Sequence, residues 1–341
     1  MPSKYNVAVV GVTSVVGEAL LSLLAERNFP IETLHALDCA EAELDRVEFR
    51  DGYVPVRDVG DFDFAQTQLA FFCAGEELAA RHVPRAAEAG CIVIDDSTQF
   101  RGKEGVPLVA PEVNAHAIAH YRRRRIIANP NSCTTMLLVA LKGIYDAAGI
   151  ERLDVATYQA VSGMGKAAMD ELAAQTVSIF NMKEVVSRVY PKQIAFIVLP
   201  VIGECLDNGY TREEMKIVEE TRKILDDERI QINASCVQVP VFFGHSQAVH
   251  IETREKVTAT TARQLLGNSP GVKLVDDCAA GAFPTAVTEA VGTDAVYVGR
   301  VRDDLSRPRG LDLWITADNV RRGAALNCIQ IAEILVKDYL G

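Results

Sequence analysis

One short segment near the start of the chain restricts the fold more than any other. Val7 to Val10 is typical of a buried strand, and it runs directly into the seven-residue turn Gly11-Val12-Thr13-Ser14-Val15-Val16-Gly17. Leucines at helical spacing follow between residues 18 and 27. A strand, a glycine turn and a helix in this order begin a doubly wound α/β sheet, whose turn can hold a dinucleotide pyrophosphate on backbone N–H groups.

The glycine pattern of this turn is incomplete. Gly11 and Gly17 occupy the first and last positions of a G-x-x-G-x-x-G variant, but Ser14 stands at the middle one. A serine can still direct its N–H at phosphate, yet we expect its side chain and its low tolerance of positive φ to crowd the site. A half-motif of this kind also occurs in plain strand–turn–helix connections that bind no nucleotide.

An acidic residue follows at the spacing that a ribose-binding carboxylate would have. Asp38 lies about 20 residues after Gly17, at the end of the second predicted strand, and Glu41 adds negative charge nearby. A carboxylate here accepts hydrogen bonds from a ribose 2′-OH and disfavours a 2′-phosphate. The sequence therefore favours NAD over NADP as cofactor, with a solvated acidic loop that binds no nucleotide as the alternative.

Further along the chain, two different patterns of predicted strands and helices indicate two domains. Strand-like runs at 34–37, 69–72 and 92–94 alternate with helical patterns, as in a Rossmann-like doubly wound parallel sheet. From about residue 150 the predicted strands lengthen (154–161, 235–243, 295–301, 311–317) around helices at 167–177 and 211–225, and an amphipathic helix spans 321–339. We expect an α/β fold: a Rossmann-like domain at 1–131 and 320–341, and an α+β mixed-sheet substrate and dimerisation domain at 132–319.

Composition excludes several classes of partner. The net charge of −11 disfavours nucleic acid and anionic membranes, and the basic run Arg122 to Arg125 is short enough for a solvated loop or strand edge. The eight cysteines show no metal-like spacing, so we expect no metal site and reduced core thiols. The N-terminus has no signal-peptide pattern and no apolar stretch reaches 18 residues, which predicts a cytoplasmic protein.

Six longer motifs resemble those of the aspartate-semialdehyde dehydrogenases, in that family's order and near its spacings. They are Val106-Pro107-Leu108-Val109-Ala110-Pro111-Glu112-Val113-Asn114, Ile127-Ala128-Asn129-Pro130-Asn131, Tyr158-Gln159-Ala160-Val161-Ser162-Gly163-Met164-Gly165, Asn208-Gly209-Tyr210-Thr211-Arg212-Glu213-Glu214-Met215-Lys216, Val239-Pro240-Val241-Phe242-Phe243-Gly244-His245-Ser246 and Asp318-Asn319-Val320-Arg321-Arg322-Gly323-Ala324-Ala325. The resemblance implies a cytoplasmic homodimer of amino-acid biosynthesis that binds NAD(P) and a small-molecule substrate. In this family a cysteine thiolate attacks an aldehyde, hydride passes to the nicotinamide, and phosphate releases the thioester.

The resemblance assigns roles to particular residues. Gln159 matches the residue that orients the acyl intermediate, and His245 matches the general acid/base. Arg101 and Lys216 match phosphate-binding residues, Glu213 matches the contact to the substrate amino group, and Asn131 lies beside the nucleophile position. The residues expected to contact the cofactor are Gly11, Thr13, Ser14, Val15, Val16, Gly17, Asp38, Ala74, Gly75 and Asn319.

Two positions depart from the family at the centre of its chemistry. The residue straight after Asn-Pro-Asn, where the family has its nucleophilic cysteine, is Ser132, and the cysteine follows as Cys133. One step along a helix rotates a side chain by about 100°, so we expect Cys133 to point away from the substrate. Gln238 stands where the family has the arginine that binds the substrate carboxylate; losing that ion pair costs on the order of 2–5 kcal/mol of binding.

Three functions remain open from the sequence. The clustered departures resemble the usg-type paralogues of the family and favour a dimeric protein whose original catalysis is lost or strongly reduced. The second hypothesis is an active NAD-dependent aldehyde oxidoreductase with an altered substrate, using Cys133 or an unusual Ser132. The third is an esterase-like activity of Ser132 with His245.

Overall fold

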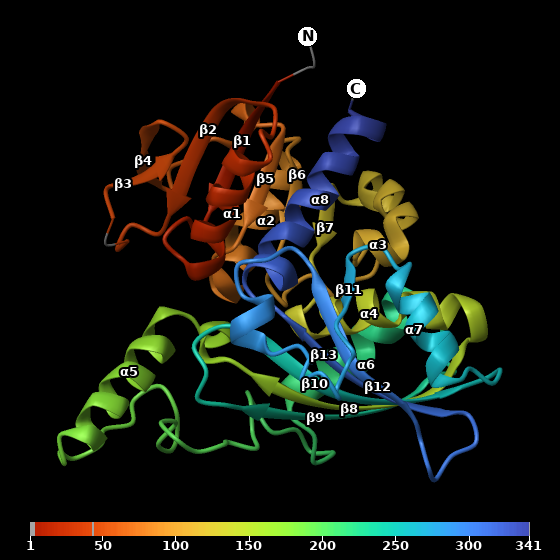
Figure 1. Ribbon diagram of the computed structural model, residues 1–341. Coiled ribbons are helices and arrows are strands. Elements are labelled where there is room, and N and C mark those ends of the chain that lie inside the picture. The colour runs from red at the N-terminus through yellow and green to blue at the C-terminus, as the bar shows by residue number, and fades with distance from the viewer. Residues whose placement is uncertain (1–3, 43, 341) are drawn as a thin grey trace. The chain divides into compact units, whose positions relative to one another are not determined.

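The protein is described by a computed structural model that covers residues 4–42 and 44–340 (Figure 1). The chain divides into two compact units, Met1–Asn131 with Ala324–Gly341, and Ser132–Gly323. The return to the first unit therefore comes at Ala324 instead of residue 320. Residues 318–323 stay with the second unit because Asp318 and Asn319 accept hydrogen bonds from its backbone, at Gly292 N (2.9 Å) and Gly244 N (2.9 Å) respectively.

The first unit is built on the predicted doubly wound sheet. Within the described residues its strand order is β3-β4-β2-β1-β5-β6-β7, and every neighbouring pair is parallel except β3 with β4. The order reverses between β1 and β5, and ligands of such sheets bind at this switch point, beyond the carboxyl ends of the strands. The strands are β1 (Tyr5–Val10), β2 (Ile31–Asp38), β3 (Arg46–Phe49), β4 (Gly52–Asp58), β5 (Leu69–Phe72), β6 (Ile92–Asp95) and β7 (Ile126–Ala128).

Helices from both ends of the chain cover this sheet. The helices of the first unit are α1 (Val15–Glu26), α2 (Gly75–Glu88), α3 (Pro111–Asn114) and α8 (Leu326–Ile334). Leucines of α1 and apolar residues of α8 share one buried core with the strands, and Arg27 pairs with Glu333 at 2.8 Å across the two helices. Figure 1 shows α8 returning from the C-terminal end of the sequence to lie among the elements of this unit.

The second unit contains the predicted mixed sheet. Its strand order is β11-β12-β13-β10-β8-β9 in the described part of the chain, parallel at the two outer pairs and antiparallel between. Buried and half-exposed residues alternate along β8, so one face packs on helices and the other remains open. The strands are β8 (Ile150–Gln159), β9 (Gln231–Gln238), β10 (His245–Thr253), β11 (Val272–Leu274), β12 (Val296–Asp303) and β13 (Gly310–Ala317).

Three helices cover the closed face, and a fourth projects from the sheet (Figure 1). The covering helices are α4 (Ser132–Ala148), α6 (Arg212–Leu225) and α7 (Ala259–Gly267), and the projecting one is α5 (Lys166–Phe180). The capping box predicted at the start of α6 is present: Thr211 Oγ1 accepts from Glu214 N at 3.2 Å, and Glu214 accepts from Thr211 N at 2.7 Å.

Three features of the strand pattern differ from the prediction. The β3–β4 hairpin was not expected, because its alternating residues are mostly polar or exposed. Strand β10 was also missed, and the strand expected over 235–243 ends at Gln238. Pro240 follows two residues later and has no N–H to donate, so the chain turns there before β10 begins at His245.

The remaining general expectations concern cysteines, the basic run and membranes. Cys91 and Cys328 are buried free thiols, as predicted, whereas Cys205 and Cys278 are exposed. Arg122 to Arg125 are all exposed, in agreement with a solvated segment. Within residues 4–42 and 44–340, no helix combines the length and the apolar character needed to span a bilayer.

Candidate functional site

The glycine turn after β1 keeps glycine only where the backbone requires it. Gly11 has φ of 85°, and a Cβ there would lie 2.7 Å from backbone atoms of Cys73 and Ala74. A Cβ on Gly17 would lie 2.1 Å from the carbonyl oxygen of Gly11. Both distances are impossible for a real side chain, so these two glycines allow β1, β5 and α1 to approach one another.

Ser14 does not crowd the turn, and this corrects the expectation from the sequence. Its φ is −75°, so the middle position does not need a glycine. Its Oγ accepts from Gly17 N at 3.0 Å and caps α1, while its proton is shared between the carbonyl oxygens of Gly11 (2.8 Å) and Cys73 (3.0 Å). The Ser14 N–H is also engaged, with Gly11 O at 3.1 Å, and is not directed at a phosphate.

Asp38 is largely occupied by the same turn. One carboxylate oxygen accepts from Thr13 N (3.0 Å) and Thr13 Oγ1 (2.8 Å), and the other accepts from Cys39 N (2.9 Å). A carboxylate can accept about four hydrogen bonds, so roughly one site remains for a ribose hydroxyl. The Asp38 carboxylate, at the end of β2, therefore holds the glycine turn that follows β1 in place through Thr13.

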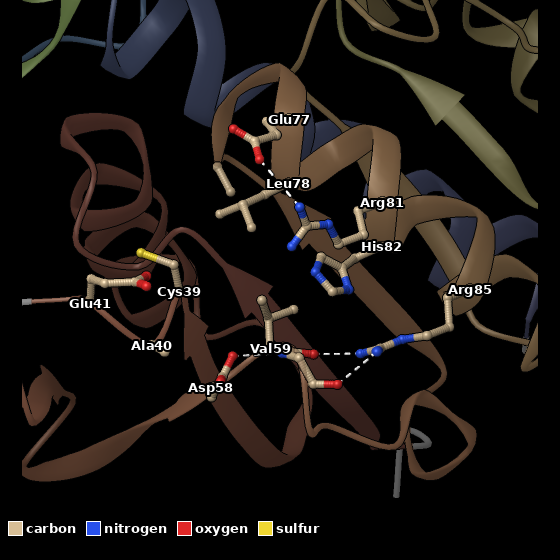
Figure 2. A pocket seen from close by; sticks show the side chains of 12 residues that line it. Cys39, Ala40, Glu41, Asp58, Val59, Glu77, Leu78, Arg81, His82 and Arg85 are labelled. Atoms are coloured by element: carbon tan, nitrogen blue, oxygen red, sulfur yellow. Dashed lines mark hydrogen bonds and ion pairs between the residues drawn. The ribbon is translucent and has the colours of Figure 1, made fainter.

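A cavity of about 770 Å³ opens beside this turn, and we call it the β2–α2 pocket (Figure 2). It lies among the residues that follow β2, the end of β4 and one face of α2. Arg85 donates to the carbonyl oxygens of Val59, Gly60 and Phe62, and Arg81 pairs with Glu77 at 3.2 Å. The sequence reasoning did not single out these basic residues, although their spacing of four places them on one helical face.

Other residues expected in the first unit lie at element ends. Ala74 is the N-cap of α2, and Gly75 begins that helix with φ of 76°, where an added Cβ would meet nothing within 4 Å. Arg101 is nearly buried and donates to Asp96 O at 2.7 Å. Asn131 is buried at the end of the first unit, directly before α4 begins in the second.

The start of α4 separates the hydroxyl from the thiol. Ser132 is half-exposed, whereas Cys133 is completely buried, as expected for a helix cysteine turned away from solvent. Burial raises the pKa of the Cys133 thiol well above its usual value, and the negative charge of Glu213 raises it further. A helix N-terminus favours a thiolate, but here desolvation dominates, so Cys133 stays protonated near neutral pH.

His245 is buried as a neutral ring. Burial lowers its pKa to about 4, against an opposing effect of Glu213. Nδ1 accepts from Ala160 N at 3.0 Å, so the proton of the neutral ring is on Nε2. Since Nε2 then donates, His245 cannot take a proton from Ser132 in this state, which argues against the esterase-like hypothesis.

Three residues assigned by the resemblance are joined by hydrogen bonds. Gln159 Nε2 donates to Glu213 Oε1 at 3.3 Å, and Lys216 Nζ pairs with Glu213 Oε2 at 3.1 Å. Glu213 also acts electrostatically on His245 and Cys133. Together with Gln159 and Lys216, these residues of the second unit lie around the start of α4, the end of β8 and the start of β10. These five side chains therefore lie together, and their roles in a site stay a prediction.

The Gln238 side chain is hydrogen-bonded within the sheet and carries no charge that could bind a substrate carboxylate. It is buried opposite Gln159 on the neighbouring strand, and its Nε2 donates to Gln159 O at 2.7 Å. A neutral amide held in this way cannot form the bidentate pair that a guanidinium makes with a carboxylate.

Asn319 is engaged within the second unit. Its Oδ1 accepts from Gly244 N at 2.9 Å, and its Nδ2 donates to Ser162 Oγ at 3.0 Å. The side chain therefore ties the turn before β10 to the turn after β8. Gly323 lies close by in sequence, and a Cβ there would come within 2.6 Å of Ser132 Cβ, so this segment packs tightly against the nucleophile position.

Comparison with known proteins gives a consistent result over the whole chain. The family model described as semialdehyde dehydrogenase, NAD binding domain, matches residues 6–121, and the one described as semialdehyde dehydrogenase, dimerisation domain, matches residues 141–322. Aspartate-semialdehyde dehydrogenase of Shewanella violacea is 50% identical over 339 residues, covering 99% of this chain and 100% of that protein. Aspartate-semialdehyde dehydrogenase 2 of Vibrio cholerae is also 50% identical over 339 residues, with the same coverage.

Solved structures agree with the sequence relatives. The crystal structure of aspartate semialdehyde dehydrogenase II from Vibrio cholerae, complexed with ASA, matches with a TM-score of 0.97 at 50% identity and covers 99% of both chains. A probable aspartate-semialdehyde dehydrogenase from Pseudomonas aeruginosa matches with a TM-score of 0.94 at 37% identity, covering 99% of this chain and 100% of that one. Its two domains, its fold and its relatives place this chain in the aspartate-semialdehyde dehydrogenase family.

Proposed function

We propose that this protein is a homodimeric, nicotinamide-nucleotide-binding member of the family in which the phosphorylating oxidation of an amino-acid semialdehyde is lost or strongly reduced. The observation that supports this most directly is the start of α4, where a half-exposed hydroxyl stands at the nucleophile position and the neighbouring thiol is buried. A usg-type paralogue would have this character, and we keep that assignment as part of the proposal.

The family's reaction depends on sulfur. A thiolate adds to the aldehyde carbon, the thiohemiacetal loses hydride to become a thioester, and phosphate displaces the thiolate to give an acyl phosphate. A bound oxidised nicotinamide supplies the hydride acceptor. In this chain Cys133 is protonated and inaccessible, and an ester on Ser132 would exchange with phosphate far less readily than a thioester.

The carboxylate anchor supports the same proposal. Without an arginine at position 238, the α-carboxylate of an amino-acid semialdehyde would lack its bidentate partner, while Glu213 and Lys216 are paired to each other at 3.1 Å. A substrate that carries no α-carboxylate would not incur this loss. Residual activity, if present, is therefore expected toward a different aldehyde.

The relatives' names favour a second candidate, an active aspartate-semialdehyde dehydrogenase. Proteins 50% identical along nearly the whole chain carry that name, and these names give no support to a loss of catalysis. Under this alternative, Cys133 or Ser132 would serve as the nucleophile after a rearrangement at the start of α4. Gln159, His245, Glu213 and Lys216 would keep their family roles.

The first unit fits a dinucleotide. Gly11 and Gly17 make a turn into which no Cβ would fit, the N-terminus of α1 follows at once, and Gly75 borders open space across the switch point. We propose NAD as the preferred cofactor over NADP. In support, Glu41, Asp58 and Glu77 line the β2–α2 pocket, and its two arginines are already engaged with Glu77 and with backbone carbonyls.

Exposed apolar side chains support a homodimer in the cytoplasm. Phe180 and Met182, at the end of α5, are 74% and 98% exposed, and Phe180 packs edge-on against the exposed Phe196. We propose that a second copy of the chain covers this surface. Separately, the eight cysteines are free thiols, which fits a reducing compartment such as the cytoplasm. Phe180→Glu should lower the molar mass measured by analytical ultracentrifugation to that of a monomer, whereas Val287→Glu, at another exposed position, should leave it unchanged.

Restoring the family's residues tests the proposal. Wild type should give no phosphate-dependent turnover of aspartate semialdehyde with NAD or NADP. The variant Ser132→Cys/Cys133→Ser/Gln238→Arg should gain turnover on the order of 100-fold or more, because the reacting sulfur returns to its aligned position. The same variant with Gln159→Ala serves as the matched control and should stay inactive. Wild-type turnover at rates usual for enzymes would establish the second candidate instead.

A further inference from the structure

One buried histidine of the first unit has a ring nitrogen with no hydrogen-bond partner in the described part of the chain. His82 lies on α2, is only 4% exposed and lines the β2–α2 pocket (Figure 2). Its Nδ1 is fully buried and has no hydrogen-bond partner among residues 4–42 and 44–340. Buried polar groups in folded proteins are nearly always hydrogen-bonded, so this exception requires an explanation. Since the ring borders the cavity, Nε2 is the nitrogen that a ligand can reach.

The location of the pocket indicates which part of a dinucleotide could enter it. The pocket lies at the carboxyl ends of the parallel strands β2 and β4, next to the turn that holds the pyrophosphate in such folds. The residues directly after β2 flank the ribose in this arrangement. Beyond the ribose lies the base, which would enter between these residues and the face of α2 that carries Leu78 and His82.

The chemistry of the pocket fits a flat heterocycle with a polar edge. Leu78 and Val59 offer apolar contact to the faces of a ring. Burial, followed by the charges of Arg85 and Arg81, lowers the pKa of His82, so the ring is neutral near pH 7. A neutral imidazole has one lone pair available. The Arg85 guanidinium is directed at backbone carbonyl oxygens, since Nη1 donates to Gly60 O and Nη2 to Phe62 O.

From this geometry we propose that His82 recognises the adenine edge of the bound dinucleotide, with Nε2 accepting a hydrogen bond from the 6-amino group. This inference rests on the proposed nucleotide binding of the first unit and adds a specificity-determining residue to it. Nε2 can accept only when the ring proton is on Nδ1, so the ligand gives Nε2 a partner while Nδ1 stays buried without one in the free and the bound protein.

Two nucleotides and three variants test the role of His82. Affinities of the full-length protein for NAD, and for its analogue with hypoxanthine in place of adenine, are measured by calorimetry. The variants are His82→Phe, which keeps a flat ring without nitrogen, His82→Gln, which keeps an acceptor, and His120→Phe as an exposed control in the same unit. Thermal unfolding without ligand is recorded for each.

We expect wild type and His120→Phe to bind NAD about tenfold more tightly than the analogue, the usual effect of one unmade polar contact. His82→Phe should bind NAD about tenfold more weakly and bind the two nucleotides within about twofold of each other, and His82→Gln should recover part of the difference. Without ligand, His82→Phe should unfold at the same temperature as wild type or higher, because no hydrogen bond is removed.

The outcomes separate this inference from the proposed function. If wild type binds NAD but His82→Phe keeps both the affinity and the preference between bases, the role of His82 is refuted and nucleotide binding stands. Equal weakening of both nucleotides by His82→Phe, together with a lower unfolding temperature, would show a structural role and also refute it. If wild type binds neither NAD nor NADP at millimolar concentration, nucleotide binding itself is refuted, and this inference with it.

Discussion

The serine in the glycine turn allows a quantitative test of whether Ser14 stabilises the turn or obstructs the dinucleotide. Ser14 caps α1 through Gly17 N, and its proton lies between the carbonyl oxygens of Gly11 and Cys73. Removing an N-cap side chain costs about 0.5–2 kcal/mol, and a carbonyl left without its donor costs about 1 kcal/mol. Ser14→Ala should therefore lower the free energy of unfolding by about 2 kcal/mol.

Ser14→Gly separates the two effects. Glycine is only a few tenths of a kcal/mol worse than serine as an N-cap, so this variant should lose mainly the link to Cys73, about 1 kcal/mol. For a domain of about 150 residues, each kcal/mol shifts the melting temperature by about 2–4 °C, which gives about 4–8 °C for the alanine and 2–4 °C for the glycine variant. Differential scanning calorimetry resolves both shifts.

The decisive comparison is the NAD affinity of Ser14→Gly. Because Ser14 has an ordinary φ of −75° and its hydroxyl points at protein carbonyls, the glycine should bind NAD within about twofold of wild type. A glycine variant that is as stable as wild type and binds NAD more than tenfold more tightly would refute this reasoning. It would mean that the serine does obstruct the pyrophosphate, as the sequence alone suggested.

Three further predictions follow from burial and capping. Iodoacetamide at pH 7.5 should modify Cys205 and Cys278 within minutes and Cys133 only after unfolding, as read by mass spectrometry; rapid labelling of Cys133 would favour the active enzyme. Since burial lowers the pKa of His245 to about 4 in the folded state while the unfolded value is about 6.5, protons bind the unfolded state first as pH falls. His245 should thus contribute a decline in stability of about 2 kcal/mol between pH 7 and 5, so the decline measured by urea denaturation should be smaller by that amount in His245→Gln. Thr211→Ala should cost about 1 kcal/mol by the same measurement, because the capping box of α6 is lost, and an unchanged midpoint would contradict it.

Local patterns in the sequence predicted much of the fold. The alternation of strands and helices before residue 130 and the spacing of Thr211 and Glu214 each reflect contacts between near neighbours, and the structure contains them. The mixed sheet of the second unit was also expected, but β10 was not, because a buried strand with few sequence signals takes its stability from partners on both sides.

The sequence predicted which residues of the candidate site lie together, but not the hydrogen bonds that they form. Gln159, Glu213 and His245 do come together, as the resemblance implied. The roles of Ser14 and Asp38 differ from the expectation because they depend on hydrogen bonds to residues distant in sequence, such as Cys73. His82 gave no signal at all, since a lone histidine on a helix has the same pattern whether it faces a core or a cavity.

The position of α8 has a consequence for synthesis on the ribosome. Leu326, Ile329 and Leu335 are buried among residues from the first third of the chain, so the N-terminal unit lacks part of its core until residues 326–335 emerge. The second unit is one continuous segment and can fold as soon as it is made. The unit whose translation begins first is therefore the last to be completed, and a chain stopped short of α8 would expose an apolar sheet face to chaperones and proteases.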